Sequence, residues 1–163
     1  SAHFYEYDPV NEINILISDM ASFTGARGKG VRTPAKIHNK PVEDKDGSIY
    51  FVPMNNGSGP RNIDFLSWEG GYWTRYNPGT NKLENLGLVD HHIGCYPIVI
   101  DKERNLLYGV GFNGYLYRFD IEKGKTTKIA RVANWDVNRD IFCDDKGNVY
   151  GSFPVARWCG SRF

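Results

Sequence analysis

The chain has 163 residues, of which 40% are hydrophobic and 14% aromatic, and its 20 Lys and Arg nearly balance its 19 Asp and Glu. The formal net charge of +1 excludes a general electrostatic attraction to nucleic acid or to an anionic membrane. The apolar runs are far shorter than a membrane-spanning helix requires. The 18 Gly, 10 Tyr and 9 Phe favour strands joined by tight turns. These properties predict an all-β domain with neither nucleic acid nor membrane as a partner.

The first predicted element is a hairpin over residues 3–18. It opens with the sequence HFYEYDP, in which aromatic residues alternate with other residues before an Asp-Pro turn. The same pattern returns at residues 72–87 (YWTRYNPGTNKLENLG) and 115–130 (YLYRFDIEKGKTTKIA). This pattern is typical of the outer two strands of a propeller blade, so we call these segments outer hairpins.

A second kind of hairpin alternates with the first along the chain. It consists of a strand, an acidic turn and a second strand, and it occurs at residues 42–51, 98–109 and 141–151. At the three turns, Gly47, Asn105 and Gly147 tolerate the positive φ that tight hairpins require. We call these segments inner hairpins.

Together the two kinds of hairpin predict four-stranded antiparallel blades of a β-propeller. Tyr108 and Tyr150 hold the same place in consecutive inner hairpins, about 40 residues apart, which is the length of one blade. Residues 1–163 are then one propeller segment. Its predicted parts are an outer half-blade (3–18), a linker (19–37), a blade (38–88) with a long insert (53–71), a second blade (91–131) and an inner half-blade (134–157).

About three blades' worth of sequence leaves a ring incomplete, because closed propellers usually have four to eight blades. Three interpretations stay open at this point. The chain is part of a six- or seven-bladed propeller, or a second copy completes the ring as a homodimer, or the chain forms an open array with exposed strand edges. The outer half-blade at one end and the inner half-blade at the other are complementary halves of one blade.

Two inserts interrupt the repeat, and long loops on a rigid scaffold often carry function. In the first, at residues 21–36, Arg27, Lys29 and Arg32 alternate with glycines, which suits either a solvated linker or a cradle for an anion. The second, at residues 53–71, combines amides and basic groups with aromatic rings. That mixture suits either a bound sugar or a cap on the propeller. Its candidate substrate-binding residues are Asn55, Asn56 and Arg61.

The segments that lead into the inner hairpins are expected to line one mouth of the central channel. They are residues 33–41, 90–97 and 134–140. Their polar and aromatic residues able to bind or protonate a ligand include His38, His92, Tyr96, Trp135, Asn138 and Arg139. The convergence of such groups from several blades predicts a ligand site.

His91, His92 and Cys95 raise the question of a divalent metal, since imidazole and thiolate groups bind zinc. Adjacent residues on an extended strand point to opposite faces, so at most one of the two histidines joins Cys95. No full ligand set is visible, and the cofactor stays undetermined.

Residues 36–38 (KIH), 46–51 (DGSIYF) and 70–78 (GGYWTRYNP) resemble bacterial β-propeller proteins related to polysaccharide lyases, the ulvan lyases in particular and the oligogalacturonate lyases more distantly. The resemblance implies an acidic oligo- or polysaccharide as partner and a secreted or periplasmic location. In these lyases a base removes the proton beside a uronate carboxylate, a cation neutralises that carboxylate, and the bond at C4 is eliminated. The resemblance gives His38 the role of base or carboxylate neutraliser and Tyr96 that of acid.

The sequence departs from that family where its second histidine would fall, because residues 52–56 read VPMNN. Asn55 is able to hydrogen-bond a carboxylate there, but its amide does not exchange a proton usefully. Three functions therefore stay open. They are a uronate lyase acting by β-elimination, a relative that binds acidic carbohydrate without turnover, and a non-catalytic propeller scaffold for protein or glycan.

Overall fold

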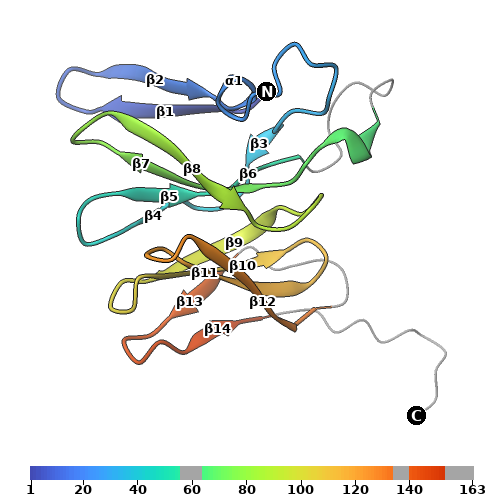
Figure 1. The fold of residues 1–163 in the computed structure, drawn as a ribbon. Coiled ribbons are helices and arrows are strands. Elements are labelled where there is room, and N and C mark those ends of the chain that lie inside the picture. Colours follow the sequence, from blue (N-terminus) through green and yellow to red (C-terminus); the bar gives the residue numbers. More distant parts are fainter. Residues whose placement is uncertain (56–63, 134–139, 153–163) are drawn as a thin grey trace.

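Figure 1 shows the fold in a computed structural model that describes residues 1–55, 64–133 and 140–152. Antiparallel strands make up nearly all the regular structure of these residues. The helical elements described are one turn of α-helix, α1 (Met20–Phe23), and one 3-10 turn, η1 (Phe65–Ser67). The predicted all-β class is therefore confirmed.

The first complete sheet is an antiparallel meander of four strands. In sheet order they are β4 (Val42–Glu43), β5 (Ile49–Phe51), β7 (Tyr72–Asn77) and β8 (Lys82–Leu88). Tyr50 on β5 pairs with Val42 on one side and with Arg75 on the other. The predicted inner and outer hairpins are thus joined edge to edge in one sheet.

The second complete sheet repeats this arrangement. In sheet order its strands are β9 (Cys95–Asp101), β10 (Leu106–Gly111), β11 (Tyr115–Asp120) and β12 (Lys125–Arg131). Tyr108 on β10 pairs with Val99 and with Arg118, so it holds the register position that Tyr50 holds in the first sheet. The prediction of repeated four-stranded antiparallel sheets is confirmed.

Two half-sheets stand at opposite ends of the stack of sheets (Figure 1). One pairs β1 (His3–Asp8) with β2 (Ile13–Asp19), and the other pairs β13 (Ile141–Cys143) with β14 (Val149–Gly151). Neither half-sheet has a third strand among the described residues. A short pair of strands, β3 (Lys36–Ile37) and β6 (Pro53–Met54), connects the end of the first insert to the start of the second.

The tips of the inner hairpins have the backbone that their sequences predict. The φ angles are 78° at Gly47, 53° at Asn105 and 86° at Gly147. These are left-handed conformations, which glycine and asparagine adopt with less strain than other residues. At the third tip, the Asp144 carboxylate also accepts hydrogen bonds from the backbone amides of Lys146 (3.0 Å) and Asn148 (2.8 Å), which closes the turn.

One aromatic contact repeats between successive sheets. Phe4 on β1 packs edge-on against Tyr76 on β7, with ring centroids 5.5 Å apart. Trp73 on β7 stacks on Phe119 of β11, also with centroids 5.5 Å apart. In the aligned outer hairpins, Phe4 and Trp73 hold one position, and Tyr76 and Phe119 hold another. The β1–β2 half-sheet and the first complete sheet therefore each pack on the sheet that follows through the same two positions.

A buried amide also ties the two complete sheets together. The Asn39 side chain is 4% exposed, and its Nδ2 donates to the carbonyl oxygens of Val52 (2.8 Å) and Cys95 (3.2 Å). Its Oδ1 accepts from the Val52 amide at 3.0 Å. Because Val52 follows β5 and Cys95 begins β9, these bonds fix the start of one sheet against the other.

Candidate functional site

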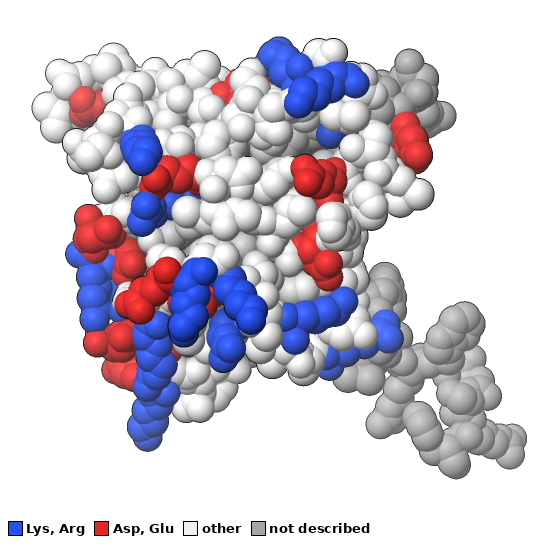
Figure 2. All heavy atoms as spheres, viewed as in Figure 1, with Lys and Arg blue, Asp and Glu red and all other residues white. Residues whose placement is uncertain are grey.

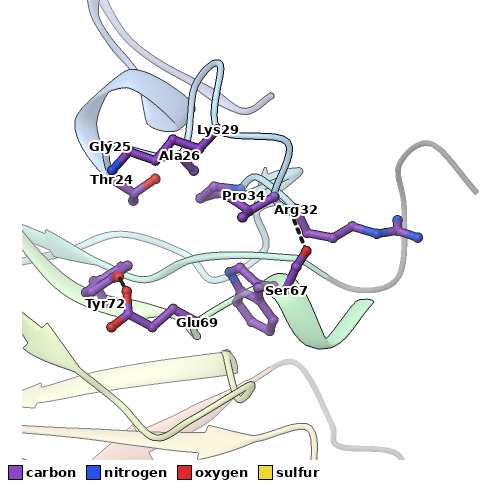
Figure 3. A pocket seen from close by; sticks show the side chains of 11 residues that line it. Thr24, Gly25, Ala26, Lys29, Arg32, Pro34, Ser67, Glu69 and Tyr72 are labelled. Carbon is purple, nitrogen blue, oxygen red and sulfur yellow. Dashed lines mark hydrogen bonds between the residues drawn. The ribbon is translucent and has the colours of Figure 1, made fainter. Parts of the chain in front are cut away.

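A pocket of about 180 Å³ lies between the two inserts (Figure 3). The first insert supplies one wall and the segment before β7 supplies the other. The lining residues are Thr24, Gly25, Ala26, Lys29, Val31, Arg32, Pro34, Ser67, Trp68, Glu69 and Tyr72. Segments that interrupt the sheet repeat therefore meet in space and enclose a hollow.

The wall from the first insert begins at a capped helical turn. Asp19 caps α1 by accepting from the Ser22 amide at 3.0 Å, and it also accepts from the Arg27 guanidinium. Burial acts to raise the pKa of the Asp19 carboxyl. Hydrogen bonds from Ser1, Arg27 and Ser22 outweigh burial and hold that pKa well below its usual range. This network gives the insert a defined shape where the sequence suggested a solvated linker.

Of the three basic residues predicted as a possible anion cradle, Lys29 presents its side chain at the pocket. Arg27 is ion-paired with Asp19 and does not line the hollow. Figure 3 shows the Arg32 guanidinium pointing away from the pocket, while its backbone amide donates to Ser67 Oγ at 2.9 Å. Within the part of the chain that the structure describes, Lys29 forms no ion pair. Its ammonium is therefore the cation that this site offers to a ligand.

The opposite wall carries a hydrogen-bonded acid and phenol. The Tyr72 hydroxyl donates to the Glu69 carboxylate, as Figure 3 shows. Burial raises the pKa of Tyr72, and the bond to Glu69 raises it further. Tyr72 is thus a neutral phenol at physiological pH, and the remaining lone pairs of Glu69 are acceptors for ligand hydroxyls.

His92 hydrogen-bonds the backbone of two residues of this wall, Trp68 and Glu69. Its Nδ1 hydrogen-bonds the carbonyl oxygen of Trp68, and its backbone amide donates to the Glu69 carbonyl oxygen at 2.8 Å. Since a carbonyl only accepts, the proton of this bond resides on Nδ1. The structure thus places His92, predicted as a substrate-binding residue, where it positions Trp68 and Glu69. Its backbone has a positive φ of 59°, which fits a residue held by its contacts.

The two residues predicted as catalytic lie together. His38 and Tyr96 come from segments that lead into different inner hairpins, and their rings meet edge to face with centroids 5.1 Å apart. Tyr96 in turn packs against Phe112 at 6.4 Å, and Phe112 stacks on Trp68 at 6.2 Å. This row of rings connects the His38–Tyr96 pair with the wall of the pocket.

The remaining predicted site residues are of two kinds. Asn55 is 1% exposed, and its Nδ2 donates to the Thr33 carbonyl oxygen at 2.8 Å, so it holds the two inserts together. Five predicted substrate-binding residues lie outside the described residues: Asn56, Arg61, Trp135, Asn138 and Arg139.

The described ranges contain no cluster of three or more His, Cys, Asp or Glu able to hold a metal ion. The Cys95 thiol is completely buried, and burial raises its pKa. A buried neutral thiol of this kind behaves as a small apolar side chain. In the same ranges, no helix has the length and apolar character needed to traverse a bilayer.

Sequence reasoning singled out both inserts but did not anticipate that they face each other. It missed Thr24, Ser67 and Glu69 as lining residues. The available signal was the departure of both inserts from the repeat. The pairing of β3 with β6, which brings them together, involves strands too short to be recognised from sequence pattern.

The fold and the pocket define a protein built of serial four-stranded antiparallel sheets with a polar hollow between two inserts. No family model matches the sequence, and no curated protein matches it. Among solved structures, the fold is similar to the extracellular domain of a one-component system from B. thetaiotaomicron, with a TM-score of 0.59 and 18% sequence identity. The match covers 90% of this chain and 17% of that chain. At this identity the likeness concerns the fold alone.

Proposed function

We propose that the chain is a β-propeller module that binds an acidic carbohydrate in the pocket between its two inserts. Two properties of the sheets support the propeller. Each complete sheet is a four-stranded meander, and an aromatic contact at the same two positions joins the β1–β2 half-sheet to the first complete sheet and that sheet to the second. The match covers only 17% of the similar structure's chain, and a propeller with further sheets would need a chain of such a length.

The observation that carries the ligand proposal is that Lys29, which forms no ion pair within the residues that the structure describes, lines the same pocket as the Glu69 carboxylate and the Trp68 and Tyr72 rings. A lysine suits a carboxylate, and the free lone pairs of Glu69 suit hydroxyl groups, whereas the Ser67 hydroxyl is already bonded to the backbone of Asp64 and Arg32. The rings of Trp68 and Tyr72 provide flat apolar surface of the kind that sugar faces contact. A single uronate unit has all three features.

The size of the pocket favours one sugar unit over a long segment. Its volume of about 180 Å³ lies below the roughly 300–1,000 Å³ typical of sites for drug-sized ligands. Longer oligosaccharides would extend along the row of rings from Trp68 towards Tyr96 and His38. A secreted or periplasmic location fits such a ligand, and the similar structure is itself an extracellular domain.

Calorimetric titration with an oligogalacturonate and with its methyl ester tests the proposal, since the ester keeps the linkage but removes the charge. We expect the acid to bind at least about tenfold more tightly than the ester, corresponding to about 1.4 kcal/mol. Lys29→Ala should abolish that difference. Arg27→Ala is the matched control, because Arg27 is a cation of the same insert that does not line the pocket. Equal binding of acid and ester, or an unchanged preference in Lys29→Ala, would contradict the proposal.

A second candidate function is uronate β-elimination, supported by the edge-to-face contact of His38 with Tyr96. In this reaction His38 takes the proton beside the carboxylate, and Tyr96 gives a proton to the leaving oxygen as the C4 bond breaks. Growth of unsaturated-uronate absorbance measures turnover. We expect His38→Ala to abolish it and Tyr96→Phe to reduce it at least about a hundredfold. A parent protein that binds the acid but shows no turnover would leave the binding module as the function.

A further inference from the structure

The outermost strand of the second complete sheet differs in charge from its counterparts in the repeat. β12 has the sequence KTTKIAR, with three basic residues and no acidic one. β8 reads KLENLGL, and its Lys82 and Glu84 pair with each other at 2.8 Å. β2 reads INILISD and has no basic residue. Lysine on an outermost strand opposes pairing with other strands, but two of these three strands do without that protection. The basic charge is therefore particular to β12.

The side chains of β12 belong to a local excess of positive charge. Figure 2 shows Lys and Arg side chains gathered over the lower part of the molecule, where β11 and β12 lie in Figure 1. Lys125, Lys128 and Arg131 of β12 are all exposed. Because the formal net charge of the whole chain is only +1, an anionic ligand is attracted to this region and not to the chain as a whole.

Two of these cations meet over one aromatic ring. The strand register sets Tyr115 opposite Arg131 and Tyr117 opposite Lys128, and directly opposite residues share one face of the sheet. Lys128 Nζ lies 4.2 Å from the centroid of the Tyr115 ring, and the guanidinium carbon of Arg131 lies 6.0 Å from it. Both distances fit cation–π contacts, so one ring holds two like charges close together.

The face that carries these side chains is turned towards the first complete sheet. Thr126, on the same face of β12, donates through Oγ1 to the carbonyl oxygen of Leu88 on β8 at 2.9 Å. Its Oγ1 also accepts from the indole of Trp73 at 3.1 Å. Asp90, just after β8, lies 3.4 Å from Lys128 Nζ. The two cations therefore lie at the junction of the two complete sheets.

This group of side chains keeps hydrogen-bond donors for a ligand. An ammonium has three donors, and the Lys128 side chain stays 46% exposed beside Asp90. Burial acts to raise the pKa of the Asp90 carboxyl. Hydrogen bonds from Tyr117, His91 and Lys128 outweigh burial and hold that pKa below its usual range. Asp90 is thus a carboxylate that shares its charge among three donors. Among the described residues, the Tyr115 hydroxyl makes no hydrogen bond.

The same group adjoins a wall of the pocket. A methyl group on Gly70 would lie 2.4 Å from the carbonyl oxygen of Asp90, so the residue after Glu69 touches Asp90. The His92 amide donates to the Glu69 carbonyl oxygen at 2.8 Å, which is a second contact between these segments. A carbohydrate that lies beside Glu69 therefore has a cationic surface next to it. The bases of a nucleic acid fit less well, because the Lys128 ammonium occupies a face of the ring on which a base would stack.

From these observations we infer that Lys128, Arg131 and Tyr115 form a second subsite, which binds a carboxylate of a longer acidic carbohydrate. The ammonium and the guanidinium supply positive charge, and the Tyr115 hydroxyl donates a hydrogen bond. The choice of ligand rests on the proposed function, but none of the three residues lines the pocket. A long chain that engages both places binds more tightly than a short one that engages the pocket alone.

Calorimetric titration with digalacturonate and with a long oligogalacturonate tests this subsite. Lys128→Ala should weaken binding of the long oligomer at least about threefold, because it removes an exposed charge contact, and should leave binding of digalacturonate unchanged. Tyr115→Phe keeps the ring beneath Lys128 and removes only the hydroxyl, so it should weaken the long oligomer about twofold. Lys125→Ala is the matched control. Lys125 is an exposed cation of the same strand, but it is opposite Asp120 and so lies on the other face of the sheet.

The outcomes separate this subsite from the pocket. Equal effects of Lys128→Ala and Lys125→Ala on the long oligomer would overturn the inference, and an equal loss for digalacturonate would overturn the division into two subsites. Weakening by Lys29→Ala but not by Lys128→Ala would overturn this inference alone, whereas the reverse would overturn the pocket alone. A protein that binds neither oligomer overturns both. Single-stranded DNA that binds more tightly than the long oligomer, and loses its affinity in Lys128→Ala, would overturn the assignment of the ligand.

Discussion

Replacing Asn39 by Ala tests whether the buried amide between the complete sheets stabilises the fold. The change removes one accepted and two donated hydrogen bonds, and it leaves polar groups of Val52 and Cys95 without that partner in a buried site. Each such bond contributes a net of roughly 0.5–1.5 kcal/mol. We therefore expect the free energy of unfolding to fall by about 3 kcal/mol.

Urea denaturation followed by tryptophan fluorescence measures this loss, because Trp73 lies between the same two sheets. Asn85→Ala is the control: Asn85 is exposed and accepts one bond, from the Gly87 amide at 2.9 Å. We expect it to lower stability by less than about 1 kcal/mol. A loss below about 1 kcal/mol for Asn39→Ala, or an equal loss in both variants, would refute the argument that Asn39 ties the sheets together.

Two further predictions concern packing and charge. Gly109→Ala should lower the free energy of unfolding by about 1–3 kcal/mol, measured by thermal denaturation, because the new methyl group would lie 2.7 Å from Cys95 Sγ and 3.0 Å from the Trp73 ring. Gly109 does not have a positive φ, so this loss reports overlap, whereas Gly87→Ala, at a φ of 112° with no atom within 4 Å of the new methyl group, reports backbone strain without overlap. Since the pKa of Asp19 is lowered on folding, its contribution to stability is complete above its unfolded pKa near 3.8 and is lost as the pH falls below that value. Denaturation curves between pH 6 and about pH 2 should therefore show a smaller acid-induced loss for Asp19→Asn than for the parent, and parallel losses would contradict this.

Residue patterns predicted the strands well because hairpins are local. The alternation of aromatic residues placed β7 and β11, and the turns at Gly47 and Asn105 placed the inner hairpins. The first insert was less predictable. Its single helical turn depends on capping by Asp19, and a helix of four residues leaves no periodic signal.

The site was predictable only in part, because it depends on contacts between distant segments. His38 and Tyr96 were expected at one mouth, and the structure brings their rings together. Asn55 and His92 had the chemistry of ligand-binding groups in the sequence, but both make hydrogen bonds that support the inserts. Residue type alone does not show whether a polar side chain is satisfied by the backbone or left for a ligand.

The pairing of large with small residues between sheets has a consequence for how the chain folds. Trp73 faces Gly109, whereas Phe4 faces Phe51, which holds the place of Gly109 in its own sheet. If the β1–β2 half-sheet docked on the second complete sheet instead of the first, Phe4 would lie on Gly109 and leave a void, which is destabilising. Similar modules in one chain are prone to misassembly during folding. Here the difference in side-chain volume between Phe51 and Gly109 favours docking of Phe4 on the first complete sheet and of Trp73 on the second.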